Sequence, residues 1–203
     1  MSSTSLRALI LDYGEVLSYP MSPGAFPEMA ALLSAPADRV AEAYWRHRRE
    51  YDMALPVEEY WRRVIADLDV SAPADRIARL IDVDVRAWTR YREETWTLAG
   101  QARRQGIRTG VLSNGVREIV EVIEAQRGWS SCFDTLVVSC DVGCAKPGPE
   151  IYRLTLERLG VAPAEALFVD DRAENIAAAQ ALGLQTLHFT GDNSVELLEK
   201  RLD

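Results

Sequence analysis

The sequence has few cysteines and no apolar run that is long enough to cross a bilayer. Cys132, Cys140 and Cys144 are odd in number and have neither metal-ligand nor redox spacing, so we expect reduced thiols and no disulfide framework. The missing apolar run excludes a transmembrane helix. The apolar stretch near the N-terminus is interrupted by Asp12 and Glu15, and no small-residue cleavage site follows, which argues against a signal peptide. We therefore expect a cytoplasmic protein without a membrane partner.

Basic residues are also scarce, because 23 Lys and Arg stand against 31 Asp and Glu, which gives a formal charge of −8. Binding to a phosphodiester backbone needs a basic surface, so we expect no nucleic-acid partner. Only Lys146 and Lys200 are lysines, while every other basic residue is an arginine. Lys146 therefore indicates a place that needs a compact ammonium group instead of a planar guanidinium.

A short apolar run, Ala8 to Leu11, ends abruptly at Asp12. Such a run predicts a strand that is buried on both faces, and Asp12 stands where this strand would leave its sheet. In open α/β sheets, ligands bind at that end of the strands. By itself, an Asp in this position is more often a turn or helix-cap residue, so the rest of the chain has to decide between the two interpretations.

The 203 residues contain a helical segment and a segment in which strands and helices alternate. The first has almost no strand signal, and helices are predicted over 27–33, 37–51, 57–68 and 74–91. Further strands are predicted over 107–112, 135–139, 166–169 and 185–189, separated by helices. Alternation of this kind is typical of a parallel sheet with helices on both faces. We therefore predict an α/β fold, a Rossmann-like doubly wound sheet formed by 1–18 and 92–203, with an inserted helical domain at 19–91.

Polar residues stand after the predicted strands, and all carboxyl ends of a parallel sheet share one edge. The residues expected at this edge are Asp12, Ser113, Asn114, Lys146, Asp170 and Asp171. Three converging carboxylates require a cation, and a set of oxygen ligands suits Mg²⁺ better than zinc. With Mg²⁺ in place, the remaining groups fit a phosphate.

The chemistry expected at this edge is phosphoryl transfer. Ser113 and the first amides of the following helix can hold phosphoryl oxygens, because a helix N-terminus is a natural anion site. Lys146 would neutralise both the nucleophile and the phosphoryl group. Asp12 would then be a covalent nucleophile that passes through an aspartyl phosphate.

Four stretches of the sequence resemble, in order, the four motifs of the haloacid dehalogenase (HAD) superfamily. They are 11–17 (LDYGEVL), 111–115 (VLSNG), 146–152 (KPGPEIY) and 168–175 (FVDDRAEN). The helical insertion stands where that family places its cap. The combination is similar to the phosphatase domain of soluble epoxide hydrolases and to related sugar-phosphate phosphatases, which have a comparable small helical cap.

The resemblance implies a Mg²⁺-dependent hydrolase, most often a phosphatase, whose cap closes over a small phosphorylated metabolite. Asp12 would be the nucleophile and a metal ligand, Gly14 would offer its backbone carbonyl to the metal, and Asp171 would be the direct acidic ligand. Asp170 would support the metal through water. No oligomeric state is predicted.

The resemblance assigns the remaining motif residues to the phosphate. Ser113 and Asn114 would bind the phosphoryl oxygens, and Lys146 would pair with Asp12. These roles follow the positions of the second and third motifs.

The sequence departs from the family pattern at Gly14, where the family normally has a second Asp that acts as general acid and base. Such help is worth about 10²–10⁴ in rate, so a slow enzyme, one that uses good leaving groups and one with a substitute acid all stay open. Glu15 is the nearest candidate substitute. Some members similar to the epoxide hydrolase phosphatase domain also have Asp-x-Gly.

Two other functions remain as alternatives. The 2-haloacid dehalogenases of the superfamily lack the second Asp and often have Ser-Asn-Gly, as at 113–115, but they use no metal, and Asp170 with Asp171 would be out of place there. A catalytically weak or inactive domain that serves as a binding or regulatory module is supported by Gly14 alone.

The helical insertion has aromatic residues and a basic run that admit two interpretations. Four tryptophans in the insertion or at its return to the core are expected mainly in a bundle core, with a stacking wall for a substrate as the alternative: Trp45, Trp61, Trp88 and Trp96. The run 46–49 is expected to be a solvated helix face, with an anchor for a second anionic group as the alternative. His188 is expected to be a core residue in a buried strand.

Overall fold

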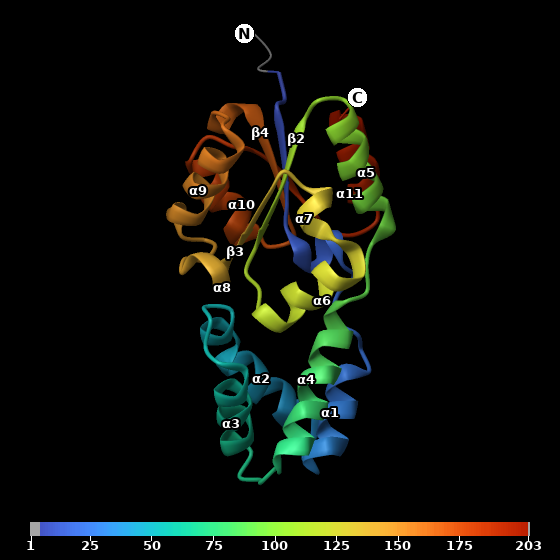
Figure 1. The fold of residues 1–203 in the computed structure, drawn as a ribbon, viewed down its shortest axis with the longest axis vertical. Coiled ribbons are helices and arrows are strands. Elements are labelled where there is room, and N and C mark those ends of the chain that lie inside the picture. The colour runs from blue at the N-terminus through green and yellow to red at the C-terminus, as the bar shows by residue number, and fades with distance from the viewer. Residues whose placement is uncertain (1–4, 203) are drawn as a thin grey trace.

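The computed structural model describes residues 5–202, and its centre is a sheet of five parallel strands in the order β3-β2-β1-β4-β5 (Figure 1). The strands are β1 (Ala8–Leu11), β2 (Arg108–Ser113), β3 (Thr135–Val138), β4 (Ala166–Asp170) and β5 (Gln185–His188). Strand β1 lies in the middle, and Ala8 is paired with Arg108 on one side and with Ala166 on the other. All four residues of β1 are fully buried, as expected of a central strand. The predicted α/β fold is confirmed.

Helices cover both faces of the sheet (Figure 1). One face packs against α9 (Pro149–Leu159) and α10 (Ala173–Ala181), and the other against α5 (Glu93–Arg104) and α11 (Asn193–Leu202). The side chains of β1 alternate between the two hydrophobic cores, because successive residues of a strand point to opposite faces. The remaining elements on this part of the chain are α6 (Arg117–Arg127), α7 (Trp129–Cys132), α8 (Ser139–Val142) and the 3₁₀ turn η2 (Pro163–Glu165).

Four further helices pack against one another beyond the carboxyl edge of the sheet (Figure 1). These helices, called the cap helices below, are α1 (Ala25–Leu33), α2 (Ala37–Tyr51), α3 (Val57–Asp67) and α4 (Ala74–Trp88). One hydrophobic core runs from one face of the sheet into the cap helices, where it includes the buried Trp61. The boundaries 19–91 of a separate domain stay a prediction.

The chain crosses between the sheet and the cap helices twice, and the two crossings run side by side. Ser18 and Tyr91 form an antiparallel bridge. The N–H of Tyr19 donates to the carbonyl of Arg90 at 2.7 Å, and the N–H of Arg92 donates to the carbonyl of Leu17 at 3.0 Å. The cap helices are therefore tied to the sheet by a short two-stranded connection.

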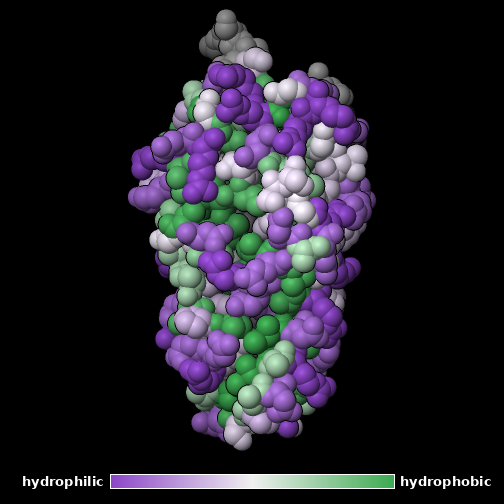
Figure 2. All heavy atoms as spheres, viewed as in Figure 1, coloured by the Kyte–Doolittle hydropathy of each residue, from purple (hydrophilic) through white to green (hydrophobic). Residues whose placement is uncertain are grey.

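Hydrophilic residues cover most of the face shown in Figure 2, with hydrophobic residues showing in patches between them. Within residues 5–202, the large hydrophobic side chains that are well exposed are Trp45, Met53 and Leu197. None of the helices in this part of the chain is both long and apolar enough to span a membrane.

The expectation that His188 is a core residue was wrong. Strand β5 lies at the edge of the sheet, and His188, its last residue, is exposed. Its Nε2 lies 2.8 Å from the carbonyl oxygen of Asp171. An edge strand is covered less completely than a central one, and the apolar pattern of the sequence does not show which strand lies at the edge.

Candidate active site

Asp12 lies directly after β1, where the chain enters the short turn segment η1 (Tyr13–Leu17). Its Oδ1 accepts a hydrogen bond of 2.6 Å from the N–H of Tyr13, which fixes the carboxylate at the sheet edge. Burial raises the pKa of Asp12 to about 7; the ammonium of Lys146 opposes this rise, and the charges of Asp170 and Asp171 add to it. The raised pKa indicates that the positive charge near Asp12 does not fully balance its burial and the neighbouring carboxylates.

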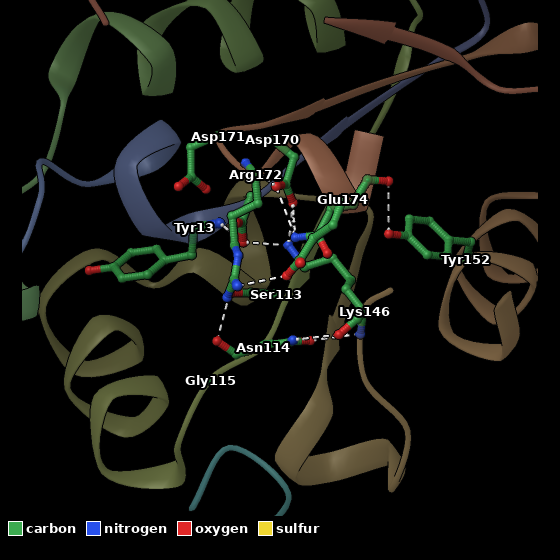
Figure 3. Close-up of polar contacts among 12 residues, drawn as sticks. Tyr13, Ser113, Asn114, Gly115, Lys146, Tyr152, Asp170, Asp171, Arg172 and Glu174 are labelled. Atoms are coloured by element: carbon green, nitrogen blue, oxygen red, sulfur yellow. Dashed lines mark hydrogen bonds and ion pairs between the residues drawn. The ribbon is translucent and has the colours of Figure 1, made fainter. Parts of the chain in front are cut away.

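Lys146 provides one positive charge to Asp170 (Figure 3) and to Asp12. Its Nζ lies 2.9 Å from Oδ1 of Asp12 and 2.6 Å from Oδ2 of Asp170, and the side chain is almost fully buried. Burial alone would lower the pKa of Lys146, but the carboxylates of Asp12 and Asp170 raise it above its usual value. The ammonium therefore stays charged and holds Asp12 in place.

The backbone around Lys146 is fixed by the side chain of Asn114, which follows β2 (Figure 3). The Nδ2 of Asn114 donates to the carbonyl of Lys146, and the N–H of Lys146 donates to Oδ1 of Asn114, both at 2.9 Å. This pair of hydrogen bonds joins the loops after β2 and β3. The side chain of Asn114 is therefore already engaged within the protein.

Asp170 ends β4 and is fully buried, with its oxygens occupied by neighbours. Its Oδ2 receives the ammonium of Lys146, and its Oδ1 accepts from the N–H of Arg172 at 2.8 Å and from Nδ2 of Asn175 at 2.9 Å. Asn175 ends the fourth motif, but the motif pattern alone predicts no role for it. Asp170 is thus placed to orient Lys146.

Asp171 is half-buried, and burial together with the charges of Asp170 and Glu15 raises its pKa to about 6. One carboxylate oxygen from each of Asp12, Asp170 and Asp171 lies within 4.8 Å of the others. Three carboxylates so close together, with one ammonium among them, fit a divalent cation that prefers oxygen ligands. The donor set therefore suits Mg²⁺.

Ser113 and the residues after it form the part of the site that fits a phosphate. Ser113 ends β2 and is buried, and within residues 5–202 its Oγ makes a single long contact of 3.4 Å, to the carbonyl oxygen of Asn114. Helix α6 begins shortly afterwards at Arg117, so its first N–H groups face the same region. The N–H of Gly115 donates to Oγ of Ser139 at 3.0 Å.

A cavity of about 290 Å³ lies between the sheet edge and the cap helices. On the sheet side it is lined by residues that include Asp12, Ser113, Asn114, Lys146 and Asp171. The side of the cavity opposite the sheet edge is lined by Trp45, Arg48, Asp52 and Trp88. The sequence predicts mainly a bundle core for Trp45 and Trp88 and a solvated face for Arg48. It assigns no role to Asp52. Helical spacing shows which residues share a face, but it does not show what lies opposite that face.

Arg48 is the buried member of the basic run 46–49 that lies in the cavity wall. Its guanidinium bonds the hydroxyl of Tyr44, donates from Nε to Oδ1 of Asp52 at 2.9 Å, and lies 3.5 Å from Oδ1 of Asp84. Trp88 packs at 5.6 Å from it. Because two carboxylates surround one guanidinium, this wall carries no surplus positive charge, which disfavours an anchor for a second anionic group.

The sequence profile of the haloacid dehalogenase-like hydrolases matches residues 7–183, which is most of the chain. The chain belongs to this family. The cluster of Asp12, Asp170 and Asp171 and the buried Lys146 all lie within the matched range.

The relatives of this HAD-like hydrolase include proteins that are named for different reactions. It is 26% identical to bifunctional epoxide hydrolase 2 of Sus scrofa over 97% of its own length, but it spans 39% of that longer protein. It is 25% identical to a phosphatase of Mycobacterium tuberculosis (89% of this chain, 86% of the relative) and 24% identical to (S)-2-haloacid dehalogenase 1 of a Pseudomonas species (93% and 86%).

A HAD family enzyme of Bacteroides thetaiotaomicron, solved in complex with magnesium and inorganic phosphate, has a similar fold. The TM-score is 0.74 at 17% identity, and the likeness covers 90% of this chain and 93% of the other. It confirms the fold of this HAD-like hydrolase.

Gly14, where the family pattern has an aspartate, has a backbone conformation that any residue can adopt (φ −59°, ψ 129°). A Cβ built there would meet only a ring carbon of Trp88, at 3.9 Å. We expect Gly14→Ala to stabilise the fold by about 0.4–1 kcal/mol, because alanine restricts the unfolded chain more than glycine does. Chemical denaturation of the purified variant measures this change.

The matched control for Gly14→Ala is Gly148→Ala, in the loop before α9. A Cβ at Gly148 would lie 2.9 Å from the carbonyl oxygen of Ala145, so this variant should lose stability. Equal losses in both variants would show that position 14 needs glycine for its backbone. A stable Gly14→Ala variant beside a destabilised Gly148→Ala variant would show that the backbone at position 14 does not require glycine.

Proposed function

We propose that this HAD-like hydrolase is a Mg²⁺-dependent phosphatase that cleaves a small phosphate ester through an aspartyl phosphate. The observation that carries the proposal is the ammonium of Lys146, held between the carboxylates of Asp12 and Asp170 with Asp171 beside them. This arrangement provides a fixed nucleophile, a cation for phosphoryl charge and oxygen ligands for a metal. The relative from Mycobacterium tuberculosis that is named as a phosphatase supports the same reaction class.

In the proposed reaction, Ser113 and Asn114 bind the phosphoryl oxygens. Ser113 uses its hydroxyl, and Asn114 uses its backbone N–H because its side chain holds the Lys146 loop. A carboxylate oxygen of Asp12 attacks phosphorus, and the bond from phosphorus to the ester oxygen breaks on the opposite side. Lys146 offsets the negative charge of both reacting groups. Water then attacks the aspartyl phosphate, which releases inorganic phosphate and restores the carboxylate of Asp12.

Asp12, the backbone carbonyl of Gly14 and Asp171 would hold Mg²⁺ directly, and Asp170 would support it through water. When bound, Mg²⁺ neutralises phosphoryl charge and orients the ester. The hydrogen bonds already made by Asp170 fit this indirect role, since both of its oxygens are engaged by protein groups.

We also propose that 19–91 acts as a cap whose inner wall selects the substrate, a small phosphorylated metabolite. The cavity of about 290 Å³ has room for a compact leaving group. Trp45 and Trp88 supply flat apolar surface on that side, and the guanidinium of Arg48 is balanced by acids. A leaving group without a second negative charge fits this wall best.

Hydrolysis of 4-nitrophenyl phosphate, with Mg²⁺ and with EDTA, tests the function. This substrate has a good leaving group, so it depends little on a general acid. We expect turnover with Mg²⁺ and a loss of roughly 10²-fold or more with EDTA, the equivalent of several kcal/mol. Readdition of Mg²⁺ should restore the rate.

Chloride release from 2-chloropropionate, measured in parallel, tests the dehalogenase alternative. The carboxylate cluster of Asp12, Asp170 and Asp171 favours phosphoryl transfer, so we expect no release above background. Chloride release that is insensitive to EDTA, without phosphatase turnover, would contradict the proposal. Absence of both activities would favour a binding or regulatory module.

A further inference from the structure

The proposed reaction requires a proton for the departing ester oxygen, and Gly14 has no side chain that could supply it. Among the described residues, four acidic side chains line the cavity: Asp12, Glu15, Asp52 and Asp171. In the proposed function, Asp12 attacks phosphorus and Asp171 binds the metal. Two candidates therefore remain for the proton transfer, Glu15 on the sheet side of the cavity and Asp52 on the cap side.

The direction of attack distinguishes these two candidates. The attacking and leaving oxygens lie roughly in line through phosphorus. Since Asp12 stands at the sheet edge, the leaving oxygen points away from that edge, toward the wall formed by the cap helices. Asp52 directly follows α2 and belongs to that wall, whereas Glu15 belongs to the turn after β1 and is near enough to Asp171 to raise its pKa.

Asp52 is tied to the phosphate-binding part of the site through its backbone. Oγ of Ser139 donates to the carbonyl oxygen of Asp52 at 2.5 Å, and the same Oγ accepts from the N–H of Gly115 at 3.0 Å. One hydroxyl thus connects the residue after α2 with the loop after β2. The position of Asp52 relative to a bound phosphoryl group is therefore fixed.

The side chain of Asp52 is also fixed, and part of it is free. Its Oδ1 accepts from Nε of Arg48 at 2.9 Å, while its Oδ2 has no hydrogen-bond partner within residues 5–202. The side chain is 17% exposed, which places it at the cavity surface and not beneath it. An oxygen held in this way can exchange a proton with a ligand.

Burial raises the pKa of Asp52 above its usual value, and the charges of Arg48, Arg172 and Lys146 oppose the rise. Its protonated form is therefore populated at a higher pH than in an exposed aspartate. A general acid is most effective when its pKa approaches the working pH. The guanidinium of Arg48 also stabilises the carboxylate that remains after the proton has left.

We propose that Asp52 is the general acid and base that replaces the carboxylate missing at position 14, an assignment that rests on the proposed phosphatase function. In the first step, the Asp12–phosphorus bond forms, the bond to the ester oxygen breaks, and Asp52 gives its proton to that oxygen. In the second step, Asp52 takes a proton from the attacking water while the Asp12–phosphorus bond breaks. Alcohol and inorganic phosphate leave, and both carboxyl groups regain their starting states.

The test is the dependence of kcat/KM on the leaving group, because this ratio reports the steps up to release of the alcohol. Substituted phenyl phosphates, from 4-nitrophenyl to unsubstituted phenyl phosphate, are compared in the wild type and in Asp52→Asn. We expect Asp52→Asn to lose roughly 10²-fold or more on phenyl phosphate and less than about 10-fold on 4-nitrophenyl phosphate. A poor leaving group needs the proton most.

Two control variants separate this role from a structural one. Asp84→Asn removes the other carboxylate beside Arg48, and Asp84 is not part of the cavity wall. Glu15→Gln removes the competing acid that does line the cavity. Both should keep the leaving-group dependence of the wild type. A uniform loss by Asp52→Asn on all esters, or the selective loss in Glu15→Gln instead, would overturn the assignment.

The same experiment also distinguishes the failure of the wider proposal. If the wild type lacks Mg²⁺-dependent turnover of 4-nitrophenyl phosphate, the phosphatase function fails, and the role of Asp52 fails with it. If the wild type turns over 4-nitrophenyl phosphate and Asp52→Asn keeps the full rate on phenyl phosphate, only the assignment of Asp52 is wrong.

Discussion

The Asp12→Asn variant is expected to hydrolyse 4-nitrophenyl phosphate at least roughly 10⁴-fold more slowly than the wild type. The amide keeps the shape of the carboxylate and can still accept the hydrogen bond from the N–H of Tyr13. It lacks the negative charge and nucleophilicity that attack on phosphorus needs. The rate of nitrophenol release under Mg²⁺ saturation measures the effect.

A control and a second measurement make the Asp12→Asn result specific. Asp75→Asn changes an exposed acid at the start of α4 in the same way and should keep the wild-type rate. Mass spectrometry after acid quenching should find a phosphorylated protein in the wild type and none in Asp12→Asn. Retention of more than a tenth of the wild-type rate by Asp12→Asn would refute the aspartyl-phosphate mechanism.

The largest expected effect on stability comes from Lys146→Met. Removal of the ammonium leaves the carboxylates of Asp12 and Asp170 buried without a counter-charge, and breaking a buried pair in this way costs about 3–5 kcal/mol. The free energy of unfolding, from urea denaturation at pH 7 without added metal, measures the loss. Turnover should disappear in the same variant, because Lys146 offsets charge in the proposed reaction.

Lys200→Met is the matched control, because Lys146 and Lys200 are the two lysines of the chain. Lys200 is exposed and pairs with Glu196 one helical turn away, an arrangement that contributes little to stability. We expect no measurable change in unfolding or turnover for this variant. If Lys146→Met unfolds at the same urea concentration as Lys200→Met, the buried ion pair does not stabilise the protein.

Much of the site was predictable because sheet topology does most of the positioning. The alternation of strands and helices predicted a parallel sheet, which is confirmed, and a parallel sheet brings residues such as Asp12, Ser113 and Asp170 to one edge. These residues meet although they are far apart in the sequence. Their roles in catalysis stay predictions until turnover is measured.

The wall opposite the sheet was not predictable in the same way. The apolar spacing in a helix such as α2 identifies its buried side, but the approach of one helix to another element depends on packing along the whole chain. The sequence pattern therefore predicts ordinary helical faces for Arg48 and Trp88, and it assigns no role to Asp52. Each of them lies in the cavity because α2 and α4 meet the sheet edge there.

Asn114 shows a related limit. The resemblance of 111–115 to the second family motif implied phosphate binding by Asn114, but the sequence did not show that its side chain would bond to the backbone of Lys146. Contacts between loops that follow different strands depend on the exact path of each loop. The order of the strands therefore predicts which residues lie close together, but only the structure shows which of their atoms form hydrogen bonds.

The central position of β1 also bears on how the chain folds during synthesis. Ala8 is made before its strand partners Arg108 and Ala166, so the central strand has to wait for most of the chain before its hydrogen bonds can form. The cap helices between Ala25 and Trp88 make mostly local contacts, which form early because little loop entropy is lost. On the ribosome, the helices that would select a substrate can therefore assemble while Asp12, made before them, still lacks its sheet partners.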